Sequence, residues 1–247
     1  MENVLELRDL AVGYGDEPIL EGVDLEVRRG EVLAILGSSG CGKSTLLRTM
    51  IGLQPPLSGR VHFCGVGDPE AATSPPRFGV VFQGAALFGS ATLLQNVLLP
   101  LQKWRDLEAA AAREVALARL RIVGLEDFAD HLPAEVSGGM RKRAGIARAL
   151  ALDPPLLFLD EPSAGLDPVT SAGLDDLLAT LARALKVSVV LVTHELPSIH
   201  RVADVCIMLD RGARGVIARG SPRELSELAE DPRVRAFFGR HAMQESQ

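Results

Sequence analysis

The sequence predicts an α/β fold with a mainly parallel β-sheet, an N-terminal antiparallel β subdomain and an inserted α-helical subdomain. Three observations support this prediction. Short apolar runs typical of buried parallel strands occur at 31–37, 156–160 and 187–193. Segments near the N-terminus instead alternate apolar and polar residues. From about Ala91 to Leu152 the pattern is mostly helical, which interrupts the strand–helix alternation and indicates the insert.

Strands dominate the N-terminal part of the chain. Residues 4–14 and 19–27 alternate apolar and polar side chains on either side of a DEP break, which predicts an antiparallel pair. The apolar run 31–37 ends in glycine and precedes a helical pattern, so we expect a buried strand followed by a helix. Residues 60–65 (RVHFCG) predict a further strand.

The helical insert shows apolar residues spaced by three or four. This spacing predicts one helix face that continues at least to Gly124, and a second helix is expected at 140–152. The residues of the first face are Trp104, Leu107, Ala111, Val115, Ala118, Ile122 and Leu125.

The C-terminal part returns to alternating strands and helices. We expect a helix at 168–185 and a hairpin formed by 205–212 and 215–220. The segment 220–225 (GSPREL) has a serine cap, a proline in the first turn and a glutamate that completes a capping box, so it predicts a helix start. The final residues, 241–247, are expected to form a frayed polar tail.

These elements divide the chain as follows. One domain is expected at 1–240, with its core at 1–83 and 153–218 and its helical insert at about 84–152. Residues 219–247 form a C-terminal helix and tail. The 247 residues are enough for one such domain with an inserted subdomain.

Composition narrows the functional classes. The formal net charge of -6 gives no support for binding nucleic acid or anionic lipid through bulk charge. The N-terminus, MENVLELRDL, lacks the pattern of a signal peptide. Cys41, Cys64 and Cys206 show no paired spacing, which indicates reduced thiols and not a disulfide framework or a zinc site. We therefore expect a soluble protein of a reducing compartment.

The segment GSSGCGKST matches the phosphate-loop pattern G-x-x-x-x-G-K-[ST] between a predicted strand and a predicted helix. Its backbone N–H groups and the helix N-terminus suit phosphate oxygens. Lys43 is expected to reach the β- and γ-phosphates, and the Ser44 hydroxyl to bind Mg²⁺. The pattern predicts a P-loop NTPase with a RecA-like core. The expected nucleotide-binding residues here are Gly37, Ser38, Ser39, Gly40, Cys41, Gly42, Lys43, Ser44 and Thr45.

Two carboxylates follow the apolar run LLFL at 156–159. Asp160 would bind Mg²⁺, and Glu161 could orient or deprotonate the attacking water. Two solvated acids after a strand are the alternative, which the phosphate loop upstream disfavours.

A third motif, VSGGM at 136–140, precedes the helical segment RKRAGIARALAL. Ser137, Gly138 and Gly139 would form a second phosphate-binding cradle at a helix N-terminus. Together with the phosphate loop and FLDEPSAGLD, this motif resembles the ATP-binding subunits of ABC transporters over nearly the whole chain. The resemblance implies an ATPase that uses ATP and Mg²⁺.

The same resemblance implies a head-to-tail homodimer. ATP would lie between the phosphate loop of one copy and Ser137, Gly138 and Gly139 of the other. Met140 stands where the family usually has glutamine. A simple helix cap is the alternative interpretation of Ser137.

Four further residues match positions of the family pattern, each with a structural alternative. Tyr14 would stack on adenine, or belong to the core or to an edge strand. Gln83 would join the Mg²⁺ shell and sense the γ-phosphate, or be a satisfied polar residue at a strand end. Asp167 would make a contact across the dimer, or cap the helix that starts at Pro168. His194 would contact the γ-phosphate as a catalytic residue with Glu161 and Lys43, or be structural.

The segment Phe78–Gln102 contains no charged residue. It is not a membrane span, because polar residues and a proline interrupt it: Gln83, Gln95, Asn96 and Pro100. Residues 78–82 are expected to be a core strand. In the family, the cleft that follows receives a short helix of the membrane permease, so the resemblance implies docking near Leu87 and Phe88. Core packing is the alternative for these residues.

Two further segments resemble a subgroup of the family and therefore bear on which cargo is transported. The motif VSGGM at 136–140, called the signature from here on, has Met140 as its last residue. This signature and the ending PRVRAFF are similar to ATPases of bacterial Mla/Mce-type lipid transporters. This implies a peripheral protein on the cytoplasmic face of the inner membrane, with a permease, further lipid-transport subunits, and phospholipid or related hydrophobic cargo. An ATPase for amino acids or lipoprotein release, or a division-type regulatory ATPase, remains the alternative.

Overall fold

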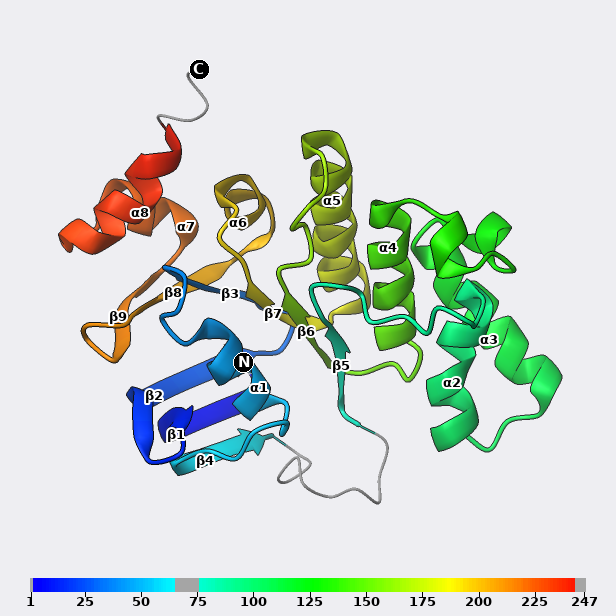
Figure 1. The fold of residues 1–247 in the computed structure, drawn as a ribbon, viewed down its shortest axis with the longest axis horizontal. Helices are drawn as coiled ribbons and strands as arrows, with labels where there is room; N and C mark the ends of the chain where they lie inside the picture. Colours follow the sequence, from blue (N-terminus) through cyan, green and yellow to red (C-terminus); the bar gives the residue numbers. More distant parts are fainter. Residues whose placement is uncertain (1, 65–75, 243–247) are drawn as a thin grey trace.

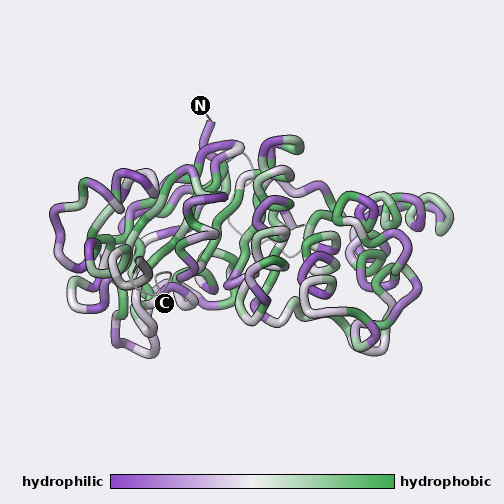
Figure 2. The backbone as a smooth tube through the Cα atoms, turned by 90° about the horizontal axis from the view of Figure 1, so that it is seen from above, coloured by the Kyte–Doolittle hydropathy of each residue, from purple (hydrophilic) through white to green (hydrophobic). Residues whose placement is uncertain are grey.

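The computed structural model describes residues 2–64 and 76–242. It confirms the predicted fold class: a mainly parallel sheet, a smaller antiparallel sheet and a group of helices beside them (Figure 1). Hydrophobic residues concentrate along the interior strands, and hydrophilic residues along the outer loops (Figure 2). Among the described residues, no helix combines the length and the apolarity needed to cross a bilayer.

The larger sheet has the strand order β5-β6-β7-β3-β8-β9. The first five strands are parallel and β9 is antiparallel to β8, which confirms the predicted hairpin. The apolar runs are buried because both faces of the parallel part are covered. The strands are β3 (Val32–Gly37), β5 (Phe78–Val81), β6 (Leu156–Asp160), β7 (Ser188–Val192), β8 (Val205–Asp210) and β9 (Gly215–Gly220).

The smaller sheet has the order β2-β1-β4, with both pairs antiparallel. One apolar cluster joins its inner face, one side of the larger sheet and helix α1, which carries the buried residues Leu46, Leu47 and Met50. Helix α1 is therefore fixed between the two sheets, directly after the phosphate-loop motif. The elements are β1 (Asn3–Tyr14), β2 (Glu17–Arg28), α1 (Lys43–Met50) and β4 (Ser58–Phe63).

Helices α2, α3 and α4 pack together at the far end of the molecule from β9 (Figure 1). Their apolar faces and the inner face of α5 form one cluster with β6 and β7. Two short 3-10 turns lie between α3 and α4. The elements are α2 (Leu93–Trp104), α3 (Ala109–Ile122), η1 (Glu126–Phe128), η2 (Pro133–Glu135) and α4 (Gly138–Ala149).

The predicted single helix face from Trp104 to Gly124 is wrong. Helix α2 ends at Trp104, the next residue, Arg105, is extended, and a new helix starts at Ala109. Helix α3 buries Ala112, Ala116 and Leu120, a face one residue out of step with the predicted one. Small side chains allow the close approach of α3 to α2 and α4, so tertiary packing selects this face over the bulkier periodic residues.

The remaining helices cover the side of the larger sheet that is opposite helix α1. Ser221 and Glu224 form the predicted capping box, with Pro222 in the first turn. A second helix follows and contributes the buried residues Val234 and Phe238, so α8 extends past the predicted start of the tail at 241; residues 243–247 lie outside the described residues. The helices are α5 (Pro168–Leu185), α6 (Leu196–Val202), α7 (Pro222–Glu227) and α8 (Pro232–Ala242).

Candidate functional site

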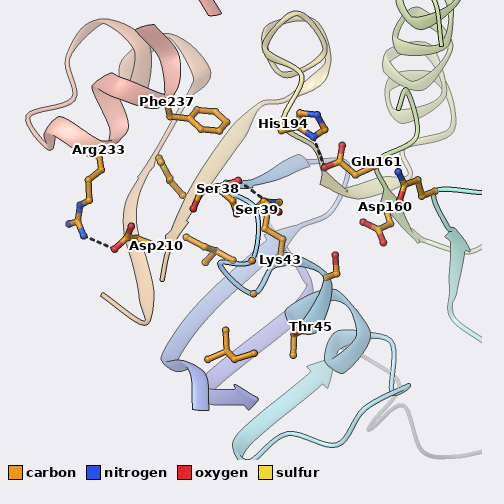
Figure 3. Close-up of a pocket in the computed structure, with 18 of the residues that line it drawn as sticks. Ser38, Ser39, Lys43, Thr45, Asp160, Glu161, His194, Asp210, Arg233 and Phe237 are labelled. Atoms are coloured by element: carbon orange, nitrogen blue, oxygen red, sulfur yellow. Dashed lines mark hydrogen bonds and ion pairs between the residues drawn. The ribbon is translucent and has the colours of Figure 1, made fainter. Parts of the chain in front are cut away.

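A pocket of about 840 Å³ lies at the carboxyl ends of the parallel strands. In open parallel sheets this edge is the usual place for ligands. Figure 3 shows the phosphate-loop residues in the middle, with Asp160, Glu161 and His194 on one side and Arg233 and Phe237 on the other. The predicted residues that line it are Tyr14, Gly37, Ser38, Ser39, Gly40, Gly42, Lys43, Ser44, Thr45, Gln83, Asp160, Glu161 and His194.

The phosphate-loop segment has the predicted context, strand β3, loop and helix α1. Gly37 has φ 145°, and a Cβ there would lie 2.5 Å from the Leu209 carbonyl oxygen, so only glycine fits. Gly42 caps α1 in the left-handed conformation, with no side chain bonded to the first-turn N–H groups. These uncapped groups face the pocket end of the helix, which suits an anion.

Lys43 lies folded over the loop. Its Nζ donates hydrogen bonds to the carbonyl oxygens of Gly37 at 2.8 Å and Ser38 at 3.1 Å. The ammonium is therefore held beside the loop where phosphate oxygens would lie, with its charge within the pocket.

Cys41 is in the loop, but its side chain is fully buried and does not line the pocket. Burial raises the pKa of this thiol. The residue therefore belongs to the core below the loop, and any contribution to nucleotide binding comes from its backbone.

Glu161 stands directly after β6 in a left-handed backbone conformation, φ 47°. Such a conformation costs a non-glycine residue about 1–3 kcal/mol and is typical of functional sites. Its N–H donates to the Val192 carbonyl at 2.8 Å, and its Oε1 lies 2.8 Å from Nδ1 of His194. Its Oε2 is buried without a hydrogen-bond partner. Glu161 lines the pocket, and a buried carboxylate oxygen without a partner is suited to hold a polar ligand such as water.

Asp160 is half-buried at the end of β6, and burial raises its pKa, with the neighbouring Glu161 charge adding to the rise. A nearby cation would reverse this effect. Ser44 and Gln83 bring further oxygen donors to the same pocket. No group of three or more His, Cys, Asp or Glu residues in the described ranges could hold a metal alone. This sparse oxygen set fits Mg²⁺, which commonly takes one or two protein ligands together with substrate phosphates and water.

Tyr14 ends β1 and is 59% exposed at the pocket rim. Its hydroxyl lies 3.4 Å from Oγ1 of Thr45. A core position for Tyr14 is thereby excluded, and its ring is accessible to a flat ligand group.

Ser137, Gly138, Gly139 and Asp167 do not line the pocket. Ser137 Oγ accepts the Met140 N–H at 3.2 Å and caps α4. Asp167 Oδ1 accepts two N–H groups at the start of α5. Hydrogen bonding to Thr170, first through its side chain and then through its N–H, lowers the pKa of Asp167. The structural alternatives proposed for Ser137 and Asp167 are therefore realised within one chain.

The two helix starts lie against each other. A Cβ on Gly139 would come within 2.4 Å of Thr170 Cγ2, so α4 and α5 approach closely there. The start of α4 thus packs closely against the start of α5, and Ser137, Gly138 and Gly139 line no part of the chain's own pocket.

Residues near Phe88 are held by a buried amide. Asn96 is fully buried; it accepts the Phe88 N–H at 2.8 Å and donates to the carbonyls of Phe88, Ala91 and Thr92. The Phe88 side chain is 59% exposed, whereas Leu87 is half-buried against the helical cluster. The uncharged segment therefore both packs internally and presents an aromatic residue.

Sequence reasoning missed seven pocket residues: Ile19, Met208, Leu209, Asp210, Arg233, Ala236 and Phe237. Three of them come from α8, and Arg233 Nη1 forms an ion pair with Asp210 Oδ1 at 2.7 Å. Arg233 and Phe237 both belong to the ending PRVRAFF. In the sequence this ending supported only the resemblance to Mla/Mce-type ATPases and did not indicate that its residues line the pocket.

Comparison with known proteins agrees with this geometry. The family model described as ABC transporter matches residues 20–164. The chain is 37% identical over 241 residues to the intermembrane phospholipid transport system ATP-binding protein MlaF of Escherichia coli K12, covering 96% of this chain and 88% of MlaF. It is 41% identical over 214 residues to the methionine import ATP-binding protein MetN of Brucella abortus, covering 85% of this chain and 58% of MetN.

A solved structure shares the fold. The ATP-binding cassette MJ0796, in a dimeric post-hydrolysis state bound to ADP and Pi, superposes with a TM-score of 0.77 and 33% identity, covering 89% of this chain and 99% of that one. Its motifs, its fold and these relatives together establish that the chain belongs to the ABC transporter family of ATP-binding, ATP-hydrolysing cassettes.

Proposed function

We propose that two copies of this chain bind two ATP molecules with Mg²⁺, close head to tail, and drive a separate membrane permease. The observation that carries the proposal is the separation of the two half-sites. The pocket has the phosphate loop, Glu161 and His194, while the signature lies on another surface of the same chain. A second copy is then required to complete each site, as expected for a dimeric cassette.

Within the pocket, each residue has a defined task. Lys43 and the loop N–H groups hold the phosphate tail, and Tyr14 stacks on adenine. Ser44, Asp160 and Gln83 hold Mg²⁺, which neutralises phosphate oxygens when bound. These assignments rest on the common pocket and on the family pattern.

Glu161 orients the attacking water and accepts its proton. The buried Oε2 without a partner is the oxygen suited to that task, since Oε1 is engaged by His194. His194 both steadies this carboxylate and contacts the γ-phosphate. Such pre-positioning reduces the reorganisation needed at the moment of reaction.

The surface near Phe88 receives the permease. An exposed aromatic held by the buried Asn96 amide provides a rigid apolar contact for a short helix. Gln83 stands between this surface and the pocket, five residues before Phe88 in the chain. Closure around ATP is then transmitted to the permease through this segment.

For cargo, we favour phospholipid or related hydrophobic molecules moved across the bacterial envelope, with the protein peripheral to the inner membrane. The match to MlaF extends over 88% of that protein, whereas the match to MetN is confined to 58% of its length. Methionine or another amino acid is the second candidate, because the identity to MetN is higher over the matched part. Lipid in the purified whole complex supports the first; stimulation by a methionine-binding protein supports the second.

Glu161→Gln tests the function. The amide keeps the shape but cannot accept a proton, so we expect the ATPase rate to fall by about 10²- to 10⁴-fold. ATP should still bind, and size-exclusion chromatography with light scattering should detect an ATP-dependent dimer. Asp176→Asn, an exposed acid on α5, is the matched control and should behave like the unmodified protein. A normal rate in Glu161→Gln, or only monomers with saturating ATP, would refute the proposal.

A further inference from the structure

Lys142 is a buried lysine in α4, the helix that begins at the signature. Lys142 is only 7% exposed and lies one turn after Gly138. Buried ammonium groups require partners. Its Nζ donates hydrogen bonds to the main-chain carbonyl oxygens of Gln83 and of Glu161, the latter at 3.4 Å. One cation therefore connects α4 to two loops of the pocket.

The two loops leave neighbouring parallel strands. Strand β5 pairs with β6, Gln83 follows β5 after one residue, and Glu161 follows β6 directly. Their carbonyl oxygens converge on a single ammonium group. The relative position of the two loops thus depends on Lys142 as well as on the sheet.

The main chain of Glu161 is held from both sides. Its N–H donates to Val192, its carbonyl accepts from Lys142, and its carboxylate contacts His194. A non-glycine residue at φ 47° keeps this conformation only when its surroundings determine it. Lys142 is one of these determinants, and the direction of the carboxylate follows from the backbone.

The ammonium also lies near the paired acids. Burial lowers the pKa of Lys142, while the charges of Asp160 and Glu161 raise it and so favour its charged form. Burial and the Glu161 charge raise the pKa of Asp160, and the Lys142 charge offsets only a small part of that rise. The cation therefore reduces the repulsion between two adjacent carboxylates without occupying the pocket, which it does not line.

We propose that Lys142 is a positioning residue for ATP hydrolysis, which holds Glu161 and Gln83 in register against the signature helix. The proposal rests on the proposed function, since it takes Glu161 as the base and the start of α4 as the cover of the partner's site. Lys142 contacts no nucleotide itself. Its role is to fix the backbone from which the reacting carboxylate extends.

The test compares Lys142→Met, Lys142→Gln and Lys142→Arg. Methionine keeps the length but removes the donors, glutamine keeps a neutral donor, and arginine keeps the charge. We expect kcat for Lys142→Met to fall by about 10- to 100-fold with KM for ATP changed by less than about threefold, because misplacement of a catalytic group by a fraction of an ångström acts mainly on the chemical step. The rates should rank Arg above Gln above Met.

Arg143→Met is the matched control. Arg143 is the next residue of α4 and also donates to two main-chain carbonyls, those of Val123 and Gly173, which lie outside the pocket. Its loss should lower thermal stability by a comparable amount while kcat stays within about twofold of the unmodified protein. If Lys142→Met does not fold, the Gln and Arg variants carry the same comparison.

Three results would overturn the proposal. They are a normal kcat in the folded Lys142 variants, a loss no larger than in Arg143→Met, and a rise in KM at unchanged kcat. Glu161→Gln is measured in parallel. Loss of turnover in Glu161→Gln with normal turnover in the Lys142 variants refutes the positioning role alone, whereas normal turnover in Glu161→Gln refutes the proposed function itself.

Discussion

At the scale of single residues, Glu161 and Gly37 show how the site departs from regular structure. Glu161 has a positive φ without being glycine, and Gly37 closes on the Leu209 carbonyl so tightly that no side chain fits. Both lie at the end of a parallel strand. The sheet is rigid enough to hold these conformations, and the pocket residues gain fixed directions from it.

The three thiols have different environments and should react differently. Cys41 and Cys206 are buried, and burial raises the pKa of Cys206 to about 12, while Cys64 is only partly buried. Because the thiolate is the reactive form, we expect iodoacetamide at pH 8 to label Cys64 first, faster at higher pH, and to leave Cys206 unmodified in the folded protein. Peptide mass spectrometry measures the sites.

Labelling of Cys41 is expected only when the loop opens. ATP should slow it further, and modification there should prevent nucleotide binding because the loop backbone can no longer close. Rapid labelling of Cys41 in the ATP-bound protein, with full ATPase activity, would contradict this placement.

At the scale of elements, the segment between β5 and α2 is shaped by one amide. Asn96 uses its oxygen and its nitrogen to satisfy four main-chain groups, so the backbone before α2 needs no regular structure of its own.

We therefore expect Asn96→Ala to destabilise the protein by about 2–4 kcal/mol, since it leaves the part-buried Phe88 N–H and Ala91 carbonyl without their partner. Urea denaturation followed by circular dichroism measures this. Gln95→Ala is the control: it removes one exposed bond to the Thr92 N–H and should cost about 1 kcal/mol or less. Equal losses in the two variants would contradict the role of Asn96.

The sequence predicts features set by residues close together in the chain better than features set by contacts between distant elements. The phosphate loop and the Asp160–Glu161 pair were found because their chemistry fixes residue types at short, invariant spacing. The face of α3 was predicted wrongly because periodicity does not tell which neighbour a helix meets. Arg233, Phe237 and Lys142 were missed for a related reason: their roles arise from contacts between elements far apart in the chain.

At the scale of the whole molecule, the half-sites can be inactivated separately. Lys43→Ala disables the phosphate loop, and Gly138→Asp places an anion on the signature. A Cβ on Gly138 meets only ordinary contacts, the nearest 3.5 Å away, so this variant should fold.

Each variant alone should be inactive, because both composite sites are damaged. Mixed in equal amounts, they should form heterodimers in which one site combines two intact halves, and ATPase activity should reappear at about a quarter of the unmodified level or below. Steady-state phosphate release measures this. A mixture as inactive as its components would argue against head-to-tail pairing.

Because Ser137–Gly139 do not line the chain's own pocket, the rate of ATP hydrolysis should depend on how often two copies meet. A lone copy would hold ATP without consuming it, so specific activity in solution should fall on dilution. Once a permease holds two copies side by side, the specific activity should no longer depend on protein concentration. ATP hydrolysis would then be confined to assembled transporter complexes.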